Sequence, residues 1–466
     1  MPTLARKLRV VDYFTLGWGT MVGVGWLVVM DDWLNRGGSL GAILGFAIGG
    51  ALLLPVAYVY GRLISAMPDA SGEVAYTARV FPRSVSFATG WMMVLAYFIV
   101  CPWEAVAIGK ICAYVLPSLN SLELYRIGGE PVYLPRLVIG LALTGFLTAM
   151  NHRGVRFSAT FLNWTAFGSL ALFAVFVGFG AAKGAPANFP PLFTHGGFVS
   201  ILLVLQIVPY FMTGFEAVGK GSEEAGPAFE GGNFFLAMWM AILAGLLFYT
   251  IIIAAVAYAA PWRQLTGLPF MTAVAFERAS GSRWIVSTIM VAAVLSLVKC
   301  FNANFVAASR LIFGMGRRGL VAAQLGSVHP RNQTPSVSVL WIGIATAGCM
   351  FLGDAILVPV TEVGSVAAAA GWLAACAAFY RMGQNTKERA AALFGVIIGL
   401  LMILMKVVPA IPGHFSQAEW LALGVWVVLG AGLGWRGLTR VVIPSEARNP
   451  GLGGDRADRD SSLRSE

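Results

Sequence analysis

The chain has 466 residues, of which 58% are hydrophobic and only 12% are charged, whereas a soluble protein carries about 25% charged residues. At least ten continuous apolar stretches run for 17 or more residues, long enough to cross a hydrocarbon core of roughly 30 Å. This composition predicts an all-α polytopic membrane protein and argues against a β-barrel, whose strands alternate in short segments. The net charge of +10 lies in short loops and tails, which excludes nucleic acid as a partner and indicates membrane orientation instead.

In chain order, the apolar stretches predict twelve transmembrane helices. They cover residues 13–34, 38–60, 85–116, 134–150, 158–182, 199–219, 233–260, 284–315, 337–353, 357–380, 391–410 and 417–438. If residues 1–12 form a cytoplasmic N-terminus, 22 of the 32 Lys and Arg residues lie on the inner side and 8 on the outer side. This bias predicts a multi-pass protein of the inner (plasma) membrane with both termini inside. Residues 439–466 are poor in apolar side chains and are expected to form a disordered cytoplasmic tail.

Two of the predicted spans contain helix-breaking residues near their middle. The first span contains Gly17, Gly19, Gly23 and Gly25, and the sixth span has Gly214 five residues after Pro209. A break inside the membrane frees backbone N–H and C=O groups, which must then meet protein, water or a ligand. Two such breaks at corresponding places of two halves are typical of a secondary transporter's binding site.

With these features in place, the sequence resembles the amino acid–polyamine–organocation (APC) permease superfamily over roughly residues 8–440. The resemblance rests on the order and spacing of residues 19–25, 66–76, 151–155 with Asn163, 214–217 followed by Glu223, Glu224 and Pro227, and 309–335. It implies a LeuT-like fold, with residues 13–182 and 199–380 as two inverted five-helix repeats, discontinuous helices 1 and 6, and two further helices over 391–438. The chain departs from the family pattern at Glu73, where a second glycine is usual.

The breaks suggest how a zwitterion could be bound. Backbone amides of the first break, with the Thr20 hydroxyl, could hold a carboxylate, and carbonyls of the second break could accept hydrogen bonds from an ammonium. Tyr210 and Asn304 are named through the resemblance, as a gate and as a substrate-facing residue. The predicted substrate-binding residues are Thr20, Met21, Gly23, Gly25, Glu104, Tyr210, Phe211, Thr213, Gly214 and Asn304. The alternative is that these glycines serve close helix packing alone.

Ionisable side chains inside predicted spans are costly and therefore suggest function. Glu104, Glu216 and Lys299 are the candidates for ion coupling. Alternatively, Glu216 holds the broken helix together and Glu104 pairs with Lys299 or with Lys406. Lys406 lies near a helix end and is expected to extend its amine to the membrane surface. The neighbouring Glu223 and Glu224 are expected to pair with loop arginines such as Arg153 or Arg317, or to be solvated.

Secondary active transport of amino acids, by symport or exchange, is the function that these features favour. Protons are the expected coupling ion, because membrane carboxylates are present and the fifth-helix lysine that replaces sodium in some relatives of the family is absent. An amine or polyamine transporter and a non-transporting amino-acid sensor remain as alternatives. An enzyme is not expected, because neither HExxH nor GxSxG occurs and the four histidines are far apart. No cofactor or metal is predicted, and the oligomeric state is left open.

Overall fold

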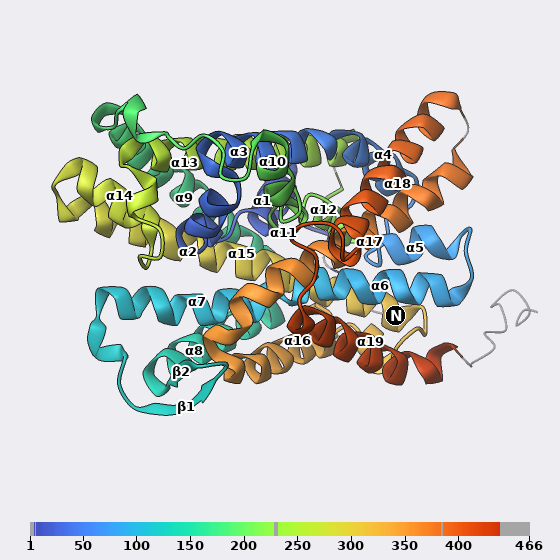
Figure 1. The fold of residues 1–466 in the computed structure, drawn as a ribbon. Coiled ribbons are helices and arrows are strands. Elements are labelled where there is room, and N and C mark those ends of the chain that lie inside the picture. The colour runs from blue at the N-terminus through green and yellow to red at the C-terminus, as the bar shows by residue number, and fades with distance from the viewer. Residues whose placement is uncertain (1–3, 5, 228–231, 384, 439–466) are drawn as a thin grey trace, which may run out of the picture.

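The computed structural model describes residue 4 and residues 6–227, 232–383 and 385–438. The tail over 439–466, which we expect to be disordered, lies outside the described residues. Long helices run side by side across the view in Figure 1, with α14 (Met271–Ser280) at the left and α5 (Glu73–Ala78) at the right. We call these two ends of the molecule the α14 face and the α5 face.

The elements follow one another as apolar helices joined by short connections. The first half contains α1 (Val10–Met21), α2 (Gly25–Val28), α3 (Met30–Leu52), α4 (Leu54–Ala66), α5, α6 (Arg83–Phe98), α7 (Val100–Val115), β1 (Glu123–Ile127), β2 (Glu130–Tyr133), α8 (Leu134–Arg153) and α9 (Val155–Lys183). The second half contains α10 (Gly197–Leu205), α11 (Val208–Met212), α12 (Ala217–Lys220), α13 (Gly232–Ala259), α14, α15 (Arg283–Arg317), α16 (Ser336–Cys349), α17 (Leu357–Met382), α18 (Thr386–Val407) and α19 (Gln417–Leu438). Short 3-10 turns are η1 (Pro117–Leu119), η2 (Pro186–Asn188), η3 (Ser222–Glu224), η4 (Trp262–Gln264), η5 (Ala323–Gly326) and η6 (Met350–Ile356).

In the described part of the chain, ten helical segments are long and apolar enough to cross a membrane. The chain is therefore a multi-pass membrane protein, and the count of twelve stays a prediction. The two predicted spans absent from the ten, 13–34 and 199–219, are the two that carry the breaks. Each is divided into short pieces, α1 and α2 in the first and α10, α11 and α12 in the second. The helix assigned as α3 also bends at Gly38, where φ is 71°.

A small β-hairpin corrects the prediction of a purely helical chain. Strands β1 and β2 pair antiparallel, with Ile127 opposite Glu130. The two residues between them, Gly128 and Gly129, both have positive φ, 58° and 87°, which a type I′ hairpin turn requires. Gly-Gly between two short runs with Tyr and Val was a readable hairpin signal, and the helix prediction overlooked it because the segment lies between two apolar spans. The Tyr125 hydroxyl donates to the Phe351 carbonyl at 2.7 Å and fixes the hairpin to η6.

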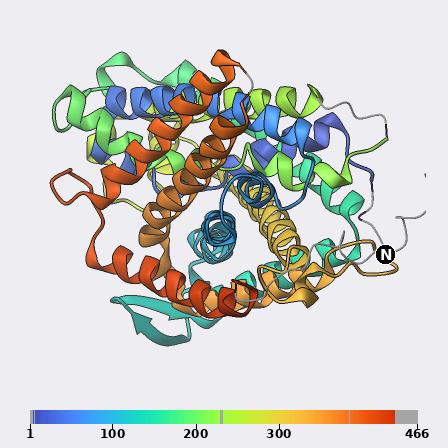
Figure 2. The same ribbon diagram turned by 90° about the vertical axis from the view of Figure 1, so that its right-hand side faces the viewer.

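The helices α6 and α7 form the most enclosed part of the bundle. In the segment from Arg83 to Val115, 94% of the most apolar 18-residue stretch is buried inside the protein. Figure 2 looks nearly along α6, which appears in light blue near the centre with other helices around it. Helix α1 packs against α9, α13 and α15, and α11 packs against α17. The two broken segments therefore lie inside the bundle, where protein groups can meet their freed backbone atoms.

Candidate functional site

The first break lies between the end of α1 at Met21 and the start of α2 at Gly25. Its carbonyl oxygens accept hydrogen bonds from side chains of α13 and α15. These bonds are Tyr249 Oη to Met21 O (2.7 Å), Ser296 Oγ to Gly23 O (2.8 Å) and Asn304 Nδ2 to Thr20 O (3.0 Å). The carbonyl groups that the break frees are thus satisfied by neighbouring helices rather than by water.

The amide side of the first break faces Glu104 of α7. The Val24 N–H donates to Glu104 Oε1 at 3.3 Å, and the Glu104 residue is only 1% exposed. A Cβ atom added to Gly23 would lie 1.9 Å from the same oxygen and 2.9 Å from the Cys300 sulfur. Glycine at position 23 therefore permits the close approach of this carboxyl group to the backbone. Glu104 occupies the place where the sequence predicts a substrate carboxylate.

The second break runs from Thr213 to Glu216, between α11 and α12. Gly214 has φ of 130°, in a region that only glycine adopts easily. The Gly214 N–H donates to Glu216 Oε2 at 3.1 Å, and the Tyr97 hydroxyl donates to Glu216 Oε1 at 3.1 Å. Glu216 therefore holds the second break together in this structure, which matches the structural alternative given above, while its role in ion coupling stays a proposal.

The two breaks are in direct contact. A Cβ atom added to Gly214 would lie 2.0 Å from Thr20 Oγ1 and 3.0 Å from the Met21 backbone nitrogen. The Thr20 hydroxyl, predicted as a donor to a carboxylate, donates instead to the Gly17 carbonyl of its own helix at 2.8 Å. In this conformation, then, Thr20 forms the contact between the breaks and its hydroxyl is satisfied within α1.

A small cavity lies where the two breaks, α7 and α15 meet. Residues from both breaks, α7 and α15 surround it: Thr20, Met21, Gly23, Gly25, Val100, Trp103, Glu104, Tyr210, Phe211 and Cys300. Seven of the ten predicted substrate-binding residues are in this set, whereas Thr213, Gly214 and Asn304 are not. The cavity measures about 10 Å³, roughly the space that one water molecule needs. The site is therefore closed around a volume too small for an amino acid.

Two buried polar atoms at this cavity have no hydrogen-bond partner among the described residues. They are Glu104 Oε2 and the Tyr210 hydroxyl. An unmet buried polar group costs about 1–3 kcal/mol, so a ligand or water that meets both atoms would recover much of that cost. The Asn304 carbonyl oxygen is also unmet, although its amide is bonded to Thr20.

The two membrane lysines differ in their surroundings. The Lys299 ammonium lies 3.6 Å from the centroid of the Trp18 ring, and no described acidic group, Glu104 included, pairs with it within 4 Å. Lys406 forms an ion pair with Glu362 and donates to the Gly413 carbonyl at 3.0 Å. At 1% exposure Lys406 does not extend to the surface, so that expectation is wrong: a buried acid close by satisfies its charge within the protein.

Ion pairs connect the loops of the α5 face to one another. Glu223 pairs with Arg317, as predicted, whereas Glu224 pairs with Arg310 at 3.1 Å and both of these side chains are fully buried. Burial raises the pKa of Asp69, and the bonds from Ser71 and Arg318 outweigh it, so the pKa of Asp69 lies below its ordinary value. Toward the other face, Arg36 joins Asp32 and Glu362 at 2.8 and 3.0 Å.

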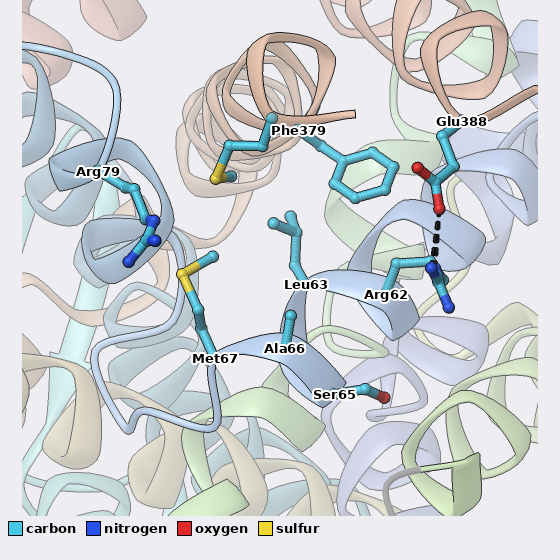
Figure 3. A pocket seen from close by; sticks show the side chains of 9 residues that line it. Arg62, Leu63, Ser65, Ala66, Met67, Arg79, Phe379 and Glu388 are labelled. Atoms are coloured by element: carbon cyan, nitrogen blue, oxygen red, sulfur yellow. Dashed lines mark hydrogen bonds and ion pairs between the residues drawn. The ribbon is translucent and has the colours of Figure 1, made fainter. Parts of the chain in front are cut away.

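A larger cavity of about 600 Å³ lies on the α5 face, between α4, α17 and α18. Arg62, Arg79, Phe379 and Glu388 surround it, and Figure 3 shows the ion pair from Arg62 to Glu388 at 2.8 Å. No residue of either break lines this cavity. We therefore take the small cavity between the breaks, and not this larger one, as the candidate substrate site.

Comparison with known proteins adds independent information. The profile of the amino acid permease family matches residues 8–432. The methylthioribose transporter of Bacillus subtilis is 24% identical over 439 residues, which cover 92% of each chain. The branched-chain amino acid permease BcaP of the same organism is 25% identical over 78% of this chain and 77% of its own length. The aromatic amino acid transport protein AroP of Salmonella typhimurium is 22% identical over 92% of this chain and 95% of its own.

Proposed function

The chain belongs to the amino acid permease family, and from that premise we propose that it carries amino acids by proton-coupled alternating access. Its relatives are permeases and transporters and not enzymes, so the open questions are the substrate, the ion and the mode of transport. In the proposal, the two halves with their broken helices are inverted repeats that move against each other around the small cavity.

The observation that carries the proposal is the cavity itself. It is bounded by both breaks and contains two unmet polar atoms, Glu104 Oε2 and the Tyr210 hydroxyl. Because its volume is too small for a substrate, binding must open it, and the contact between Gly214 and Thr20 is the natural place for the breaks to separate. A substrate carboxylate would then take over the Val24 amide from Glu104, while an ammonium would lie toward Tyr210 and Phe211.

The charges near the first break support the proposal of proton rather than sodium coupling. Lys299 places an amine between α1 and α15, close to the breakpoint. When it is protonated, its positive charge opposes a sodium ion nearby, because like charges a few ångström apart repel strongly in a medium of low dielectric constant. Glu104 and Glu216 offer oxygens that can take a proton instead, and together with Lys299 they are the proposed ion-coupling groups.

An amine or polyamine is a second candidate substrate class, and Glu104 is the observation in its favour. The free oxygen of this carboxyl group faces the cavity and could accept a hydrogen bond from a substrate ammonium. A substrate without a carboxylate would leave the bond between Glu104 and Val24 in place. The two classes therefore differ in whether Glu104 must move.

Uptake into reconstituted vesicles tests the function. Purified protein should accumulate at least one labelled amino acid under an inward proton gradient, without sodium, and should exchange it against the same unlabelled compound. Accumulation that survives proton uncouplers and requires sodium would contradict proton coupling. A protein that binds amino acids but neither accumulates nor exchanges them would be a sensor instead.

The substrate can be identified by thermal stabilisation, because a ligand that binds only the folded state raises Tm. The screen should contain the twenty standard amino acids, putrescine and spermidine, and methylthioribose, since a relative carries that compound in its name. Stabilisation by an amino acid that is lost when its carboxylate is amidated supports binding at the first break. Stabilisation by the amines alone favours the second class.

A further inference from the structure

Next to the second break, two buried carboxyl groups face one buried amine. Glu73 of α5 pairs with Lys220 of α12, and these side chains are 0% and 1% exposed. Glu216 is likewise 0% exposed, and it accepts the hydroxyl of Tyr97. The Tyr97 ring also lies against the Lys220 ammonium, at 5.6 Å from its centroid. Glu73, Lys220 and Glu216 thus belong to one cluster, joined through Tyr97.

Titratable groups from four helices lie around the cluster. They are Tyr60 of α4, Tyr76 of α5, Tyr97 of α6 and Cys376 of α17, with Asp69 at the edge, where it is paired with Arg318. The Tyr60 hydroxyl donates to Glu73 Oε1 at 3.0 Å, and the Tyr76 hydroxyl has no partner among the described residues. Tyrosine and cysteine are neutral near pH 7, so they add no charge to the count.

The charges in this cluster do not balance. With both carboxyl groups ionised and Lys220 protonated, the buried cluster carries a net charge of minus one. A buried charge without a partner is expensive, and two carboxylates that share one site retain a proton between them. By contrast, the fully buried pair of Glu224 and Arg310 is neutral as it stands. Among the described residues, no other Lys or Arg pairs with Glu73 or Glu216.

We propose that Glu73, Glu216 and Lys220 form a single proton-binding site that holds one proton between the two carboxyl groups. The inference rests on the proposed function and narrows it, because of the three proposed ion-coupling groups it assigns the coupled proton to Glu216, with Glu73 and Lys220 as its neighbours, and not to Glu104 or Lys299. Gly72 beside Glu73 has φ of 47°, and an added Cβ would lie 2.5 Å from Lys220 Nζ, so the loop closes tightly over the amine.

The position of the cluster gives the proton a route to each side. Glu216 belongs to the second break, so a movement of α11 and α12 changes its contact with Tyr97. On the other side, Ala75 of the same helix as Glu73 lines a cavity of about 370 Å³ on the α5 face, together with Asp69, Arg79 and Arg318. A proton taken up as an O–H bond on a carboxyl group of the cluster can be released to water on this side when α5 moves.

Charge counting predicts a distinct result for each variant. In Glu73→Gln the cluster keeps one carboxylate, Glu216, and one ammonium, Lys220, so neither needs a further proton for the cluster to be neutral. In Lys220→Met the two carboxyl groups have no cation beside them, so the cluster should hold two protons, one on each carboxyl group. The double variant leaves Glu216 alone, which should again hold one proton, as in the wild type. If Glu73 and Lys220 form only a structural ion pair, the double variant should not regain the wild-type number of bound protons.

The first readout is the dependence of Tm on pH for the full-length protein in detergent, which needs no substrate. Releasing a buried proton leaves an uncompensated charge, so Tm of the wild type should fall as pH rises. We expect a flatter slope for E73Q, a steeper one for K220M and the wild-type slope for E73Q/K220M. The matched control E224Q removes a buried acid outside the cluster and should lower Tm while keeping the slope. Equal slopes in all five proteins, or a double variant that follows E73Q, would overturn the proposal.

The second readout is transport in vesicles, with the labelled amino acid that exchanges fastest in the wild type. One proton moved per substrate under a gradient of one pH unit can drive about tenfold accumulation, since one pH unit corresponds to a factor of ten. E73Q should exchange but accumulate only about onefold, and E73Q/K220M should regain accumulation. If no amino acid exchanges in the wild type, the proposed function fails, while the Tm series still decides whether the proton site exists.

Discussion

The two breaks are stabilised in different ways. At the first break, side chains of three other helices satisfy the backbone: Glu104 from α7, Tyr249 from α13, and Ser296 and Asn304 from α15. At the second break, Glu216 from the break itself caps Gly214, and α6 contributes only Tyr97. The first break therefore depends on the packing of its neighbours and can exchange a partner for a ligand, whereas the second break is largely self-contained and can move as a unit.

The largest effect should come from adding a methyl group where the two breaks touch. In Gly214→Ala the new Cβ would meet the Thr20 side chain and the Met21 backbone nitrogen, and φ of 130° is unfavourable for alanine. Overpacking and backbone strain cost about 1–3 kcal/mol each, so we expect a loss of about 2–6 kcal/mol in unfolding free energy.

Gly23→Ala is the matched variant at the first break. Its Cβ would meet the end of the flexible Glu104 side chain and the Cys300 sulfur, which can shift, so about 1–2 kcal/mol is expected. Thermal unfolding of both variants measures the difference. A larger loss for G23A than for G214A would contradict the view that the second break moves as a rigid unit.

Neutralising the carboxyl group at each break separates their roles. In Glu216→Gln one amide oxygen must replace two acceptor oxygens, so either the Gly214 amide or the Tyr97 hydroxyl loses its partner, at a cost of about 1–3 kcal/mol. In Glu104→Gln the single oxygen can still accept from Val24, because the second oxygen has no partner, and less than about 1 kcal/mol should be lost.

Thermal stability of E104Q and E216Q in detergent, without ligand, measures this difference directly. Equal losses in the two variants would mean that Glu104 holds the first break as firmly as Glu216 holds the second. In that case the exchange of Glu104 for a substrate carboxylate would be disfavoured.

Removing one hydroxyl at each break should have a smaller effect. Ser296 donates to Gly23 from a different helix, whereas Thr213 donates to Pro209 within its own segment at 2.6 Å. Ser296→Ala should cost about 1 kcal/mol, because the freed carbonyl is buried. Thr213→Val should cost about half as much, since the Pro209 carbonyl keeps the Thr213 amide as a partner. Chemical or thermal denaturation of both variants measures the two losses. A smaller loss for Ser296→Ala than for Thr213→Val would contradict this prediction.

The smallest effect is expected for Asp69→Asn, a control substitution outside both breaks. The pKa of Asp69 lies below its ordinary value, so its contribution to stability is present above the ordinary pKa of an aspartate and is lost as pH falls through the lower, folded value. Asp69→Asn should therefore be less stable than the wild type at neutral pH, by less than about 1 kcal/mol for a partly exposed pair. The difference in Tm should shrink as the pH falls below the ordinary pKa of an aspartate, and a difference that grows in acid would refute the assignment.

Composition and motif order predicted the membrane class, the family and the two broken segments, because these depend on local sequence. A run of apolar residues spans a bilayer whatever its neighbours are, and glycine or proline interrupts a helix wherever it occurs. Six of the seven predicted substrate residues that surround the cavity were found for the same reason, since they lie at or beside the breaks, whereas the seventh, Glu104, comes from α7.

Partners across helices could not be predicted in the same way. The sequence left open whether Glu104 meets Lys299, and only the position of α7 beside the first break shows that it meets the Val24 amide instead. Lys406 reaches Glu362, and Glu73 reaches Lys220 across 147 residues of sequence. The sequence by itself determined that the chain has long apolar segments able to cross a membrane, and which two segments are broken. The tertiary structure decided which charges meet, because that depends on helix rotation and depth, which the apolar pattern of a single helix does not specify.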